Sequence, residues 1–239
     1  QGASLRVVTE RSKLAMPETN IGLFPDVGGG YFLSRCTGRL GEYLALTGHV
    51  LQGKDAMAAG LADGFIESGR LVGLWTTLST TPFETGEAVQ RWVTNHLQTT
   101  APKAPWPAAE IDRIFTQTKV REIVATLEGT DSDWAQATAK VLRQRSPLML
   151  HVVLEQIRRA RKLGLADDLR MERGLVRRCF HLRPGAASET VEGIRALAVD
   201  KDHAPKWNPA RIEDVTPAEV AAFFEPPWPA HAHPLAHLG

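Results

Sequence analysis

The sequence predicts an α/β fold in which small strand-and-helix units lead into a mostly helical C-terminal region. Of the 239 residues, 43% are hydrophobic and 23% are charged, an ordinary composition for a globular protein with a real core. Short apolar runs broken by proline and glycine fill the chain up to about residue 70. After about residue 110, apolar residues recur at the spacing of helices.

The strands and helices of the first part are expected to be short. Leu5–Thr9 alternates weakly, as a half-buried strand does, a second strand is expected near residues 13–16, and Phe65-Ile66 is a brief strand candidate. Short helices are expected in three places: from Tyr31, over residues 38–47 and over Lys54–Gly60.

The later part is expected to be helical around a Pro-rich spacer at Pro102–Pro107. One helix is expected before the spacer, near Glu84–Leu97, in a stretch rich in Thr, Pro and Gly. The helices expected after it are 120–127, a helix from Asp131 or Ser132 to Arg143, one begun by Ser146-Pro147, then 167–180, 188–198 and a short one behind the capping box at Thr216.

These patterns predict three parts: residues 1–75 as strand-and-helix units, 76–225 as a helical region, and 226–239 as a disordered tail rich in Pro, Ala and His. Lys plus Arg number 28 and Asp plus Glu 27, so the net charge of +1 offers no field for nucleic acid. No apolar run is long enough for a membrane span, and no signal-peptide pattern opens the chain. Two cysteines cannot form a disulfide framework, so we expect an intracellular, cytoplasmic protein.

Two carboxylates stand out in residues 15–30, because each follows a proline and lies near apolar residues. Glu18 and Asp26 would each have a raised pKa in such surroundings and could serve as acid or base near neutral pH. Gly28–Gly30 follow, and we expect them to let a substrate approach a backbone whose helix N-terminus supplies free N–H groups. The plainer interpretation is a pair of solvated turn carboxylates.

Other candidates for chemistry are weaker. His231, His233 and His237 have no Cys or carboxylate partners nearby in the sequence, so no metal site is expected. The glycine triplet lacks the residues of a phosphate loop. Cys179 fits a helix pattern as a small buried residue rather than a nucleophile.

Residues 15–33 read Ala-Met-Pro-Glu-Thr-Asn-Ile-Gly-Leu-Phe-Pro-Asp-Val-Gly-Gly-Gly-Tyr-Phe-Leu. This stretch resembles the crotonase (enoyl-CoA hydratase/isomerase) superfamily and, almost letter for letter, its 3-hydroxyisobutyryl-CoA hydrolase branch. The resemblance continues through Leu40–Gly48, the Ser146-Pro147 helix and Asp200–Trp207, and covers nearly the whole chain to about residue 225. It implies the C-terminal part of a crotonase-like ββα spiral followed by helices.

The resemblance also implies a reaction. Hydrolases of this branch carry Asp at the position of Asp26, where typical hydratases carry Gly, and the position of Glu18 is catalytic in both. It therefore implies hydrolysis of a short 3-hydroxyacyl-CoA thioester in valine catabolism, with no cofactor beyond the CoA of the substrate. Glu18 would attack the thioester carbonyl or activate water, and Asp26 would hydrogen-bond the 3-hydroxyl or position the water.

Alternatives remain at this point. In the superfamily, the oxyanion-hole donors come from two segments before the Pro-Glu motif, so the chain resembles an N-terminally truncated member that lacks useful activity alone. It could instead be a hydratase or isomerase of the same fold, or a non-catalytic relative that acts as an interaction protein. The resemblance also implies a homo-oligomer, without fixing the number of subunits.

Overall fold

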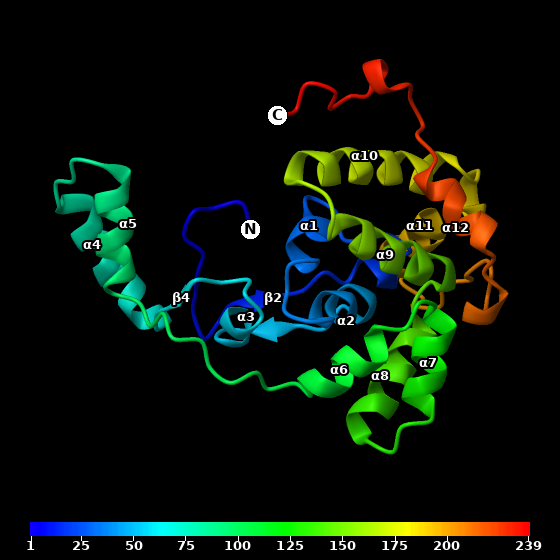
Figure 1. Cartoon of the computed structure of the whole chain (residues 1–239), viewed down its shortest axis with the longest axis horizontal. Coiled ribbons are helices and arrows are strands. Elements are labelled where there is room, and N and C mark those ends of the chain that lie inside the picture. The colour runs from blue at the N-terminus through cyan, green and yellow to red at the C-terminus, as the bar shows by residue number, and fades with distance from the viewer. The chain divides into compact units, whose positions relative to one another are not determined.

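The structure, a computed structural model, describes all of residues 1–239. It contains four two-residue strands, twelve α-helices and several single helical turns (Figure 1). The chain falls into two compact units, one of residues 1–15 with 50–108 and one of residues 16–49 with 109–239.

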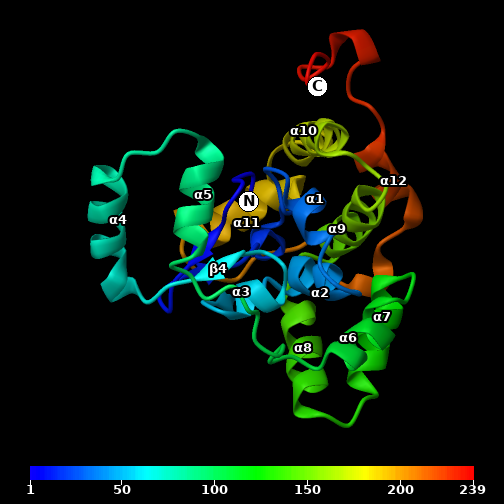
Figure 2. The ribbon, with the colours of Figure 1, turned by 60° about the vertical axis from the view of Figure 1, so that its left-hand side comes forward.

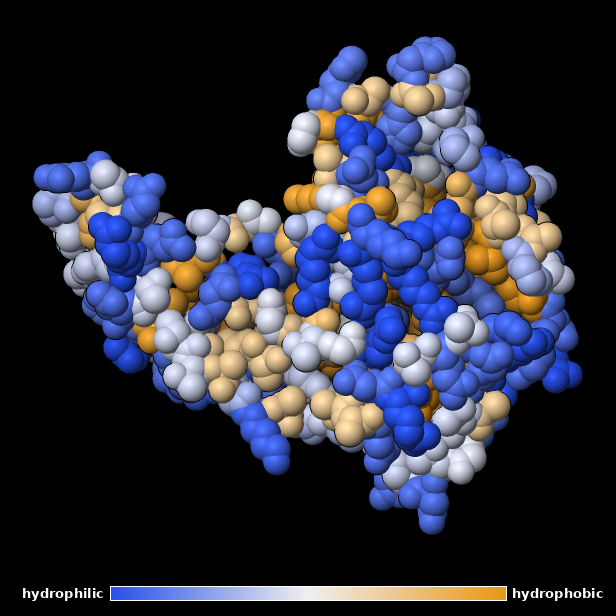
Figure 3. Space-filling view, viewed as in Figure 1, coloured by the Kyte–Doolittle hydropathy of each residue, from blue (hydrophilic) through white to orange (hydrophobic).

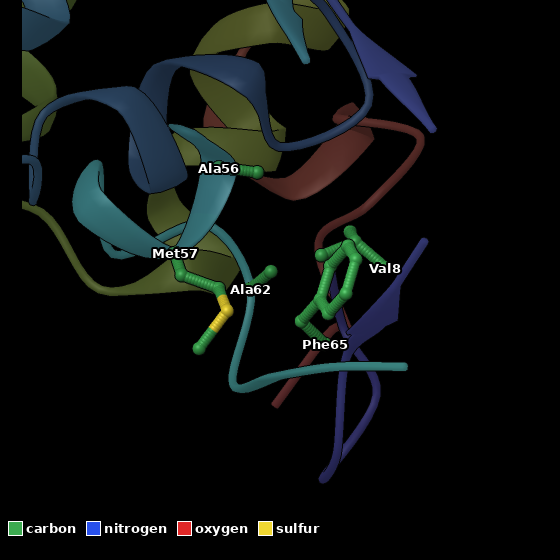
Figure 4. Packing of buried hydrophobic residues seen from close by; sticks show 5 residues of the cluster. All are labelled: Val8, Ala56, Met57, Ala62 and Phe65. Carbon is green, nitrogen blue, oxygen red and sulfur yellow. The ribbon is translucent and has the colours of Figure 1, made fainter. Parts of the chain in front are cut away.

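The first unit holds the strands. β1 (Val7–Val8) pairs in parallel with β4 (Gly64–Phe65), and β2 (Lys13–Leu14) pairs antiparallel with β3 (Leu51–Gln52). With α3 (Asp55–Ala58), these strands bury a small apolar cluster, in which the ring of Phe65 lies beside Val8 (Figure 4). The members of this cluster are Val8, Ala56, Met57, Ala62 and Phe65.

Two further helices of the first unit, α4 (Leu71–Thr80) and α5 (Gly86–Thr94), pack side by side (Figures 1 and 2). The sequence prediction gave only α5 and was wrong to leave α4 out, because threonines and a glycine lower helix propensity there. Four threonine and serine hydroxyls of α4 donate to carbonyl oxygens one turn back, so they do not compete with the helix.

The second unit is built from helices alone. Their bounds are α1 Gly29–Leu33, α2 Leu40–Thr47, α6 Ala108–Phe115, α7 Val120–Glu128, α8 Asp133–Gln144, α9 Pro147–Ala160, α10 Leu165–His181, α11 Glu189–Ile194 and α12 Pro217–Phe224. α9 lies at the centre, in contact with α1, α2, α7 and α12. Its inward side chains, among them Leu150 and Ile157, are fully buried, as the apolar spacing predicts.

Helix ends in this unit confirm the predicted caps. Ser132 Oγ accepts from Ala135 N at 3.2 Å, and Ser146 Oγ accepts from Met149 N at the same distance. Thr216 and Glu219 form the predicted capping box at the start of α12.

The predicted division at residue 75 stays a prediction, since the two contact units follow other boundaries. The disorder predicted after residue 226 also stays a prediction. In the structure the last residues contact α10, where Arg170 Nε donates to Leu235 O at 3.0 Å. None of the helices has both the length and the apolar character that crossing a bilayer requires.

Candidate active site

Glu18 opens a single 3₁₀ turn, Glu18–Ile21, directly after Pro17. Gly22 ends the turn in the left-handed region, at φ 67°. Both Gly22 N and Leu23 N donate to Glu18 O, so the backbone folds back tightly on the glutamate. Pro17 favours this start because it has no N–H to leave unpaired.

The second unit holds this turn from several sides. Thr190 Oγ1 of α11 donates to Gly22 O at 2.6 Å, and a Cβ on Gly22 would lie only 2.2 Å from Glu189 O. On the α2 side, Thr19 Oγ1 donates to Leu46 O at 3.1 Å within the buried interior. Since these contacts fix the backbone, they fix where the side chain of Glu18 begins.

The carboxyl of Glu18 is half-buried and keeps one oxygen without a partner. Its Oε2 atom is buried and accepts no hydrogen bond. The pKa of Glu18 is raised to about 7: burial is the largest cause, its own backbone N–H acts in the opposite sense, and the negative charge of Asp26 adds a smaller rise. A carboxyl with this pKa can hold or release a proton near neutral pH.

Asp26 lies in the loop between Pro25 and α1, half-buried, and its carboxylate has no hydrogen-bond or ion-pair partner within the chain. The structure therefore brings together the two carboxylates that the sequence singled out. The carboxylate of Glu42, by contrast, is fully buried between Arg39 and Arg161 and forms ion pairs with both. Glu18 and Asp26 differ from it in having oxygens free for another molecule.

The expectation of free N–H groups at the start of α1 is wrong. Gly29 N donates to Asp26 O at 2.9 Å. Gly28 N and Gly30 N donate to the two carboxyl oxygens of Glu172, at 2.8 and 3.0 Å, and Tyr31 N donates to Asp168 Oδ2 at 2.9 Å. The N–H groups at the start of α1 therefore all have acceptors within the chain, three of them in side chains of α10.

The glycines do not open the backbone to a substrate either, which corrects a second expectation. A Cβ on Gly30 would lie 2.7 Å from Asp168 Oδ1 and 3.0 Å from Gln156 Nε2. One on Gly29 would lie 2.9 Å from Pro25 Cβ. Gly30 therefore lets the loop pack against α9 and α10, and Gly29 lets it pack against Pro25.

Sequence reasoning missed Asp168, Glu172 and Gln156. A signal was available in α10, where Asp168, Glu172, Leu175 and Cys179 lie four, three and four residues apart and are all buried. Two carboxyls on the inward stripe of a helix indicate a buried polar partner, but the sequence cannot say which one.

The remaining candidates gain no chemical role here. The structure contains no group of three His, Cys, Asp or Glu side chains that could hold a metal. Cys179 is buried, and burial raises the pKa of its thiol to about 12, so it is no nucleophile.

A cavity of about 380 Å³ lies between α7, α9 and α12, and neither Glu18 nor Asp26 lines it. Figure 3 shows apolar surface near α12.

A model of the enoyl-CoA hydratase/isomerase family matches residues 1–224. The chain belongs to this family. Among curated members of similar sequence, 3-hydroxyisobutyryl-CoA hydrolase 1 of Arabidopsis thaliana is 39% identical over 228 residues, with 92% of this chain and 60% of that protein covered. The mitochondrial 3-hydroxyisobutyryl-CoA hydrolase of Gallus gallus is 37% identical, with 92% and 58% covered.

Two solved structures of the enoyl-CoA hydratase/isomerase fold are also similar. A carnitinyl-CoA dehydratase from Mycobacterium thermoresistibile has a TM-score of 0.76 at 37% identity, covering 94% of this chain and 62% of that one. An enoyl-CoA hydratase from Rhodobacter sphaeroides 2.4.1 has a TM-score of 0.78 at 35% identity, with the same coverage. The predicted partial crotonase fold is confirmed, and the chain spans about 60% of the length of these curated relatives.

Proposed function

We propose that this protein hydrolyses the thioester of 3-hydroxyisobutyryl-CoA, a short 3-hydroxyacyl-CoA, to the free acid and CoA. The observation that carries the proposal is the proximity of Glu18 and Asp26: Glu18 keeps a buried oxygen that accepts no hydrogen bond, and Asp26 is close enough for its charge to act on the pKa of Glu18. Curated relatives named as this hydrolase, at 36 to 39% identity, support the choice of substrate.

Glu18 is the group that reacts. In one route its carboxylate adds to the thioester carbonyl carbon, the C–S bond breaks, and CoA leaves as a thiolate that takes up a proton. Water then hydrolyses the resulting anhydride. In the other route Glu18 takes a proton from the water that adds. Both routes consume one water and release one acid and one CoA thiol, and neither calls on a metal or prosthetic group.

The two routes differ in where the oxygen of water ends. Turnover in ¹⁸O-labelled water places the label in Glu18 only if the carboxylate attacks and water then adds to the glutamyl carbonyl of the anhydride; water that adds to the acyl carbonyl labels the released acid instead. Label found by mass spectrometry in the peptide that contains Glu18 therefore establishes the anhydride route.

Asp26 is proposed to bind the 3-hydroxyl group of the acyl chain. A carboxylate built to accept from a hydroxyl discriminates strongly against analogues without one, because its own hydrogen bond is then lost. A panel of acyl-CoA substrates tests this with the protein expressed from its complete reading frame. We expect kcat/KM for 3-hydroxyisobutyryl-CoA to be well above that for isobutyryl-CoA. In Asp26→Gly the ratio of the two kcat/KM values should be smaller.

Hydration of a double bond is the second candidate, favoured by the names of the solved structures. The same panel decides: formation of 3-hydroxyacyl-CoA from an enoyl-CoA, without release of free CoA, would replace hydrolysis as the function. A non-catalytic interaction protein remains the third candidate. Absence of any acyl-CoA turnover would favour it.

The proposal includes a place in valine breakdown, a cytoplasmic location and assembly into a homo-oligomer, with no nucleic-acid partner. Several animal relatives are named mitochondrial, so cell fractionation is the direct check of location. Sedimentation of the purified protein measures its assembly.

A further inference from the structure

Three side chains from α9 and α10 form hydrogen bonds to the loop that carries Asp26, although they lie more than 130 residues away in sequence. Before Asp26, Gln156 Nε2 donates to Pro25 O at 2.7 Å. After it, Glu172 accepts from Gly28 N and Gly30 N, and Asp168 accepts from Tyr31 N. The loop is therefore pinned on both sides of the candidate catalytic carboxylate.

The pinned loop is strained. Val27 adopts φ 58° and Gly28 follows at φ 81°. A positive φ is a true outlier for a β-branched residue, since its Cβ crowds the backbone. The side chain of Val27 is 82% exposed, so no packing of its own holds this conformation. A strained backbone conformation persists only where surrounding contacts hold it in place. Here the hydrogen bonds from α9 and α10 hold the loop on both sides of Val27.

Asp168 and Glu172 are two neighbouring carboxyls in the buried face of α10. Burial raises the pKa of both, that of Glu172 to about 8, and Arg35 is the positive charge that acts on Asp168 in the opposite sense. A hydrogen bond from the Glu172 carboxyl to Asp168 lowers the pKa of Asp168 and raises that of Glu172. Asp168 Oδ1 is buried and is without a hydrogen-bond partner, whereas Oδ2 accepts from Tyr31 N.

We propose that Gln156, Asp168 and Glu172 are positioning residues, which hold the strained loop of residues 25–31 so that the carboxylate of Asp26 stays beside that of Glu18. The inference deepens the proposed function, because it says what keeps the two carboxylates paired. It also explains why Gly30 and the α1 N–H groups are closed to a substrate.

The test is the ¹³C titration of Glu18 in the chain of residues 1–239, which needs no activity. In Glu172→Gln, an amide N–H₂ replaces one acceptor oxygen and faces an N–H donor, so the loop should relax and Asp26 should move. We expect the pKa of Glu18 to fall as far as it does in Asp26→Asn, and the double variant to add nothing further. An unchanged Glu18 pKa in folded Glu172→Gln would overturn the proposal.

Controls separate positioning from general loss of structure. Asp168→Asn should behave almost as wild type, because its amide oxygen can accept from Tyr31 N while its N–H₂ donates to Glu172. Glu42→Gln removes a buried carboxylate paired elsewhere and should leave the Glu18 titration unchanged. If Glu172→Gln does not fold, Gln156→Met frees the loop before Asp26 instead and should give the same fall in pKa; no fall there overturns the proposal equally.

Kinetics of the complete protein add a second readout. We expect Glu172→Gln to lower kcat at least tenfold with KM changed less than threefold, and to weaken the preference for hydroxylated acyl-CoA. Loss of the Glu18 shift together with unchanged kcat would refute the positioning role. If the protein hydrolyses no acyl-CoA at all, the proposed function fails, and the titration still decides the inference.

Discussion

At the scale of single residues, the partners of each carboxylate distinguish Glu42 from Glu18 and Asp26, the two carboxylates of the proposed site. Glu42 lies between two arginines, whereas Glu18 keeps a buried oxygen without any donor. A buried group without a partner costs stability, and such costs concentrate where a ligand supplies the missing partner. Glu18 should therefore weaken the fold when it is ionised.

Stability should fall with rising pH because of Glu18. Its pKa in the folded state, about 7, lies above the ordinary value of 4.5, so its proton favours the folded chain. This contribution is complete below about pH 4.5 and is lost as the pH rises through 7. After allowance for solvent screening, we expect Glu18→Gln to gain about 1–2 kcal/mol at pH 8 in urea unfolding.

The exposed Glu84→Gln is the control for that experiment and should stay within about 0.5 kcal/mol of wild type at both pH values. A Glu18→Gln variant that is less stable than wild type at pH 8 would contradict the absence of a partner for Oε2.

The charge of Asp26 should change the pKa of Glu18 only in part. Burial is the largest cause of the raised pKa of Glu18, and the charge of Asp26 is a smaller one. We therefore expect Asp26→Asn to lower the Glu18 pKa while leaving it clearly above 4.5, as measured by ¹³C NMR. A fall all the way to 4.5 would mean that the neighbouring charge, not burial, sets the value.

At the scale of elements, the sequence predicted the features that depend on neighbouring residues, such as helix caps. The caps at Ser132, Ser146 and Thr216 were all readable, since each bonds to a residue three positions on. The fate of the N–H groups at the start of α1 was not readable, because their acceptors belong to α10 and no local pattern links the two. Glu18 and Asp26 were found because they lie eight residues apart in one motif.

Gly22 should be the glycine that the site tolerates least. It combines a positive φ with a backbone contact, since a Cβ would lie 2.2 Å from Glu189 O. We expect Gly22→Ala to cost more than about 2 kcal/mol in thermal or urea unfolding, through strain plus the displacement of α11 from Glu18. Gly185 is the matched control, at φ 51° with nothing within 4 Å, and should cost about 1 kcal/mol. An equal loss of unfolding free energy in the Gly22 and Gly185 variants would show that α11 moves aside at little cost.

At the scale of the whole molecule, apolar residues remain exposed on α4 in the first unit. Trp75 is 72% exposed, with Val72 and Leu71 also exposed on the same helix. Contiguous apolar surface of this kind favours association with another surface. We expect Val72→Ser with Trp75→Ser to reduce self-association of the 239-residue chain in sedimentation velocity, and to change its stability by less than about 0.5 kcal/mol. Unchanged sedimentation would assign no such role to α4.

The central claim is that Glu18 carries out thioester hydrolysis beside Asp26. The most direct measurement is steady-state release of CoA from 3-hydroxyisobutyryl-CoA by the protein from the complete reading frame, with Glu18→Gln compared at neutral pH. We predict a loss in kcat of at least about 100-fold, with acyl-CoA affinity, measured by calorimetry, kept within a few fold. Turnover by Glu18→Gln within tenfold of wild type would contradict the claim.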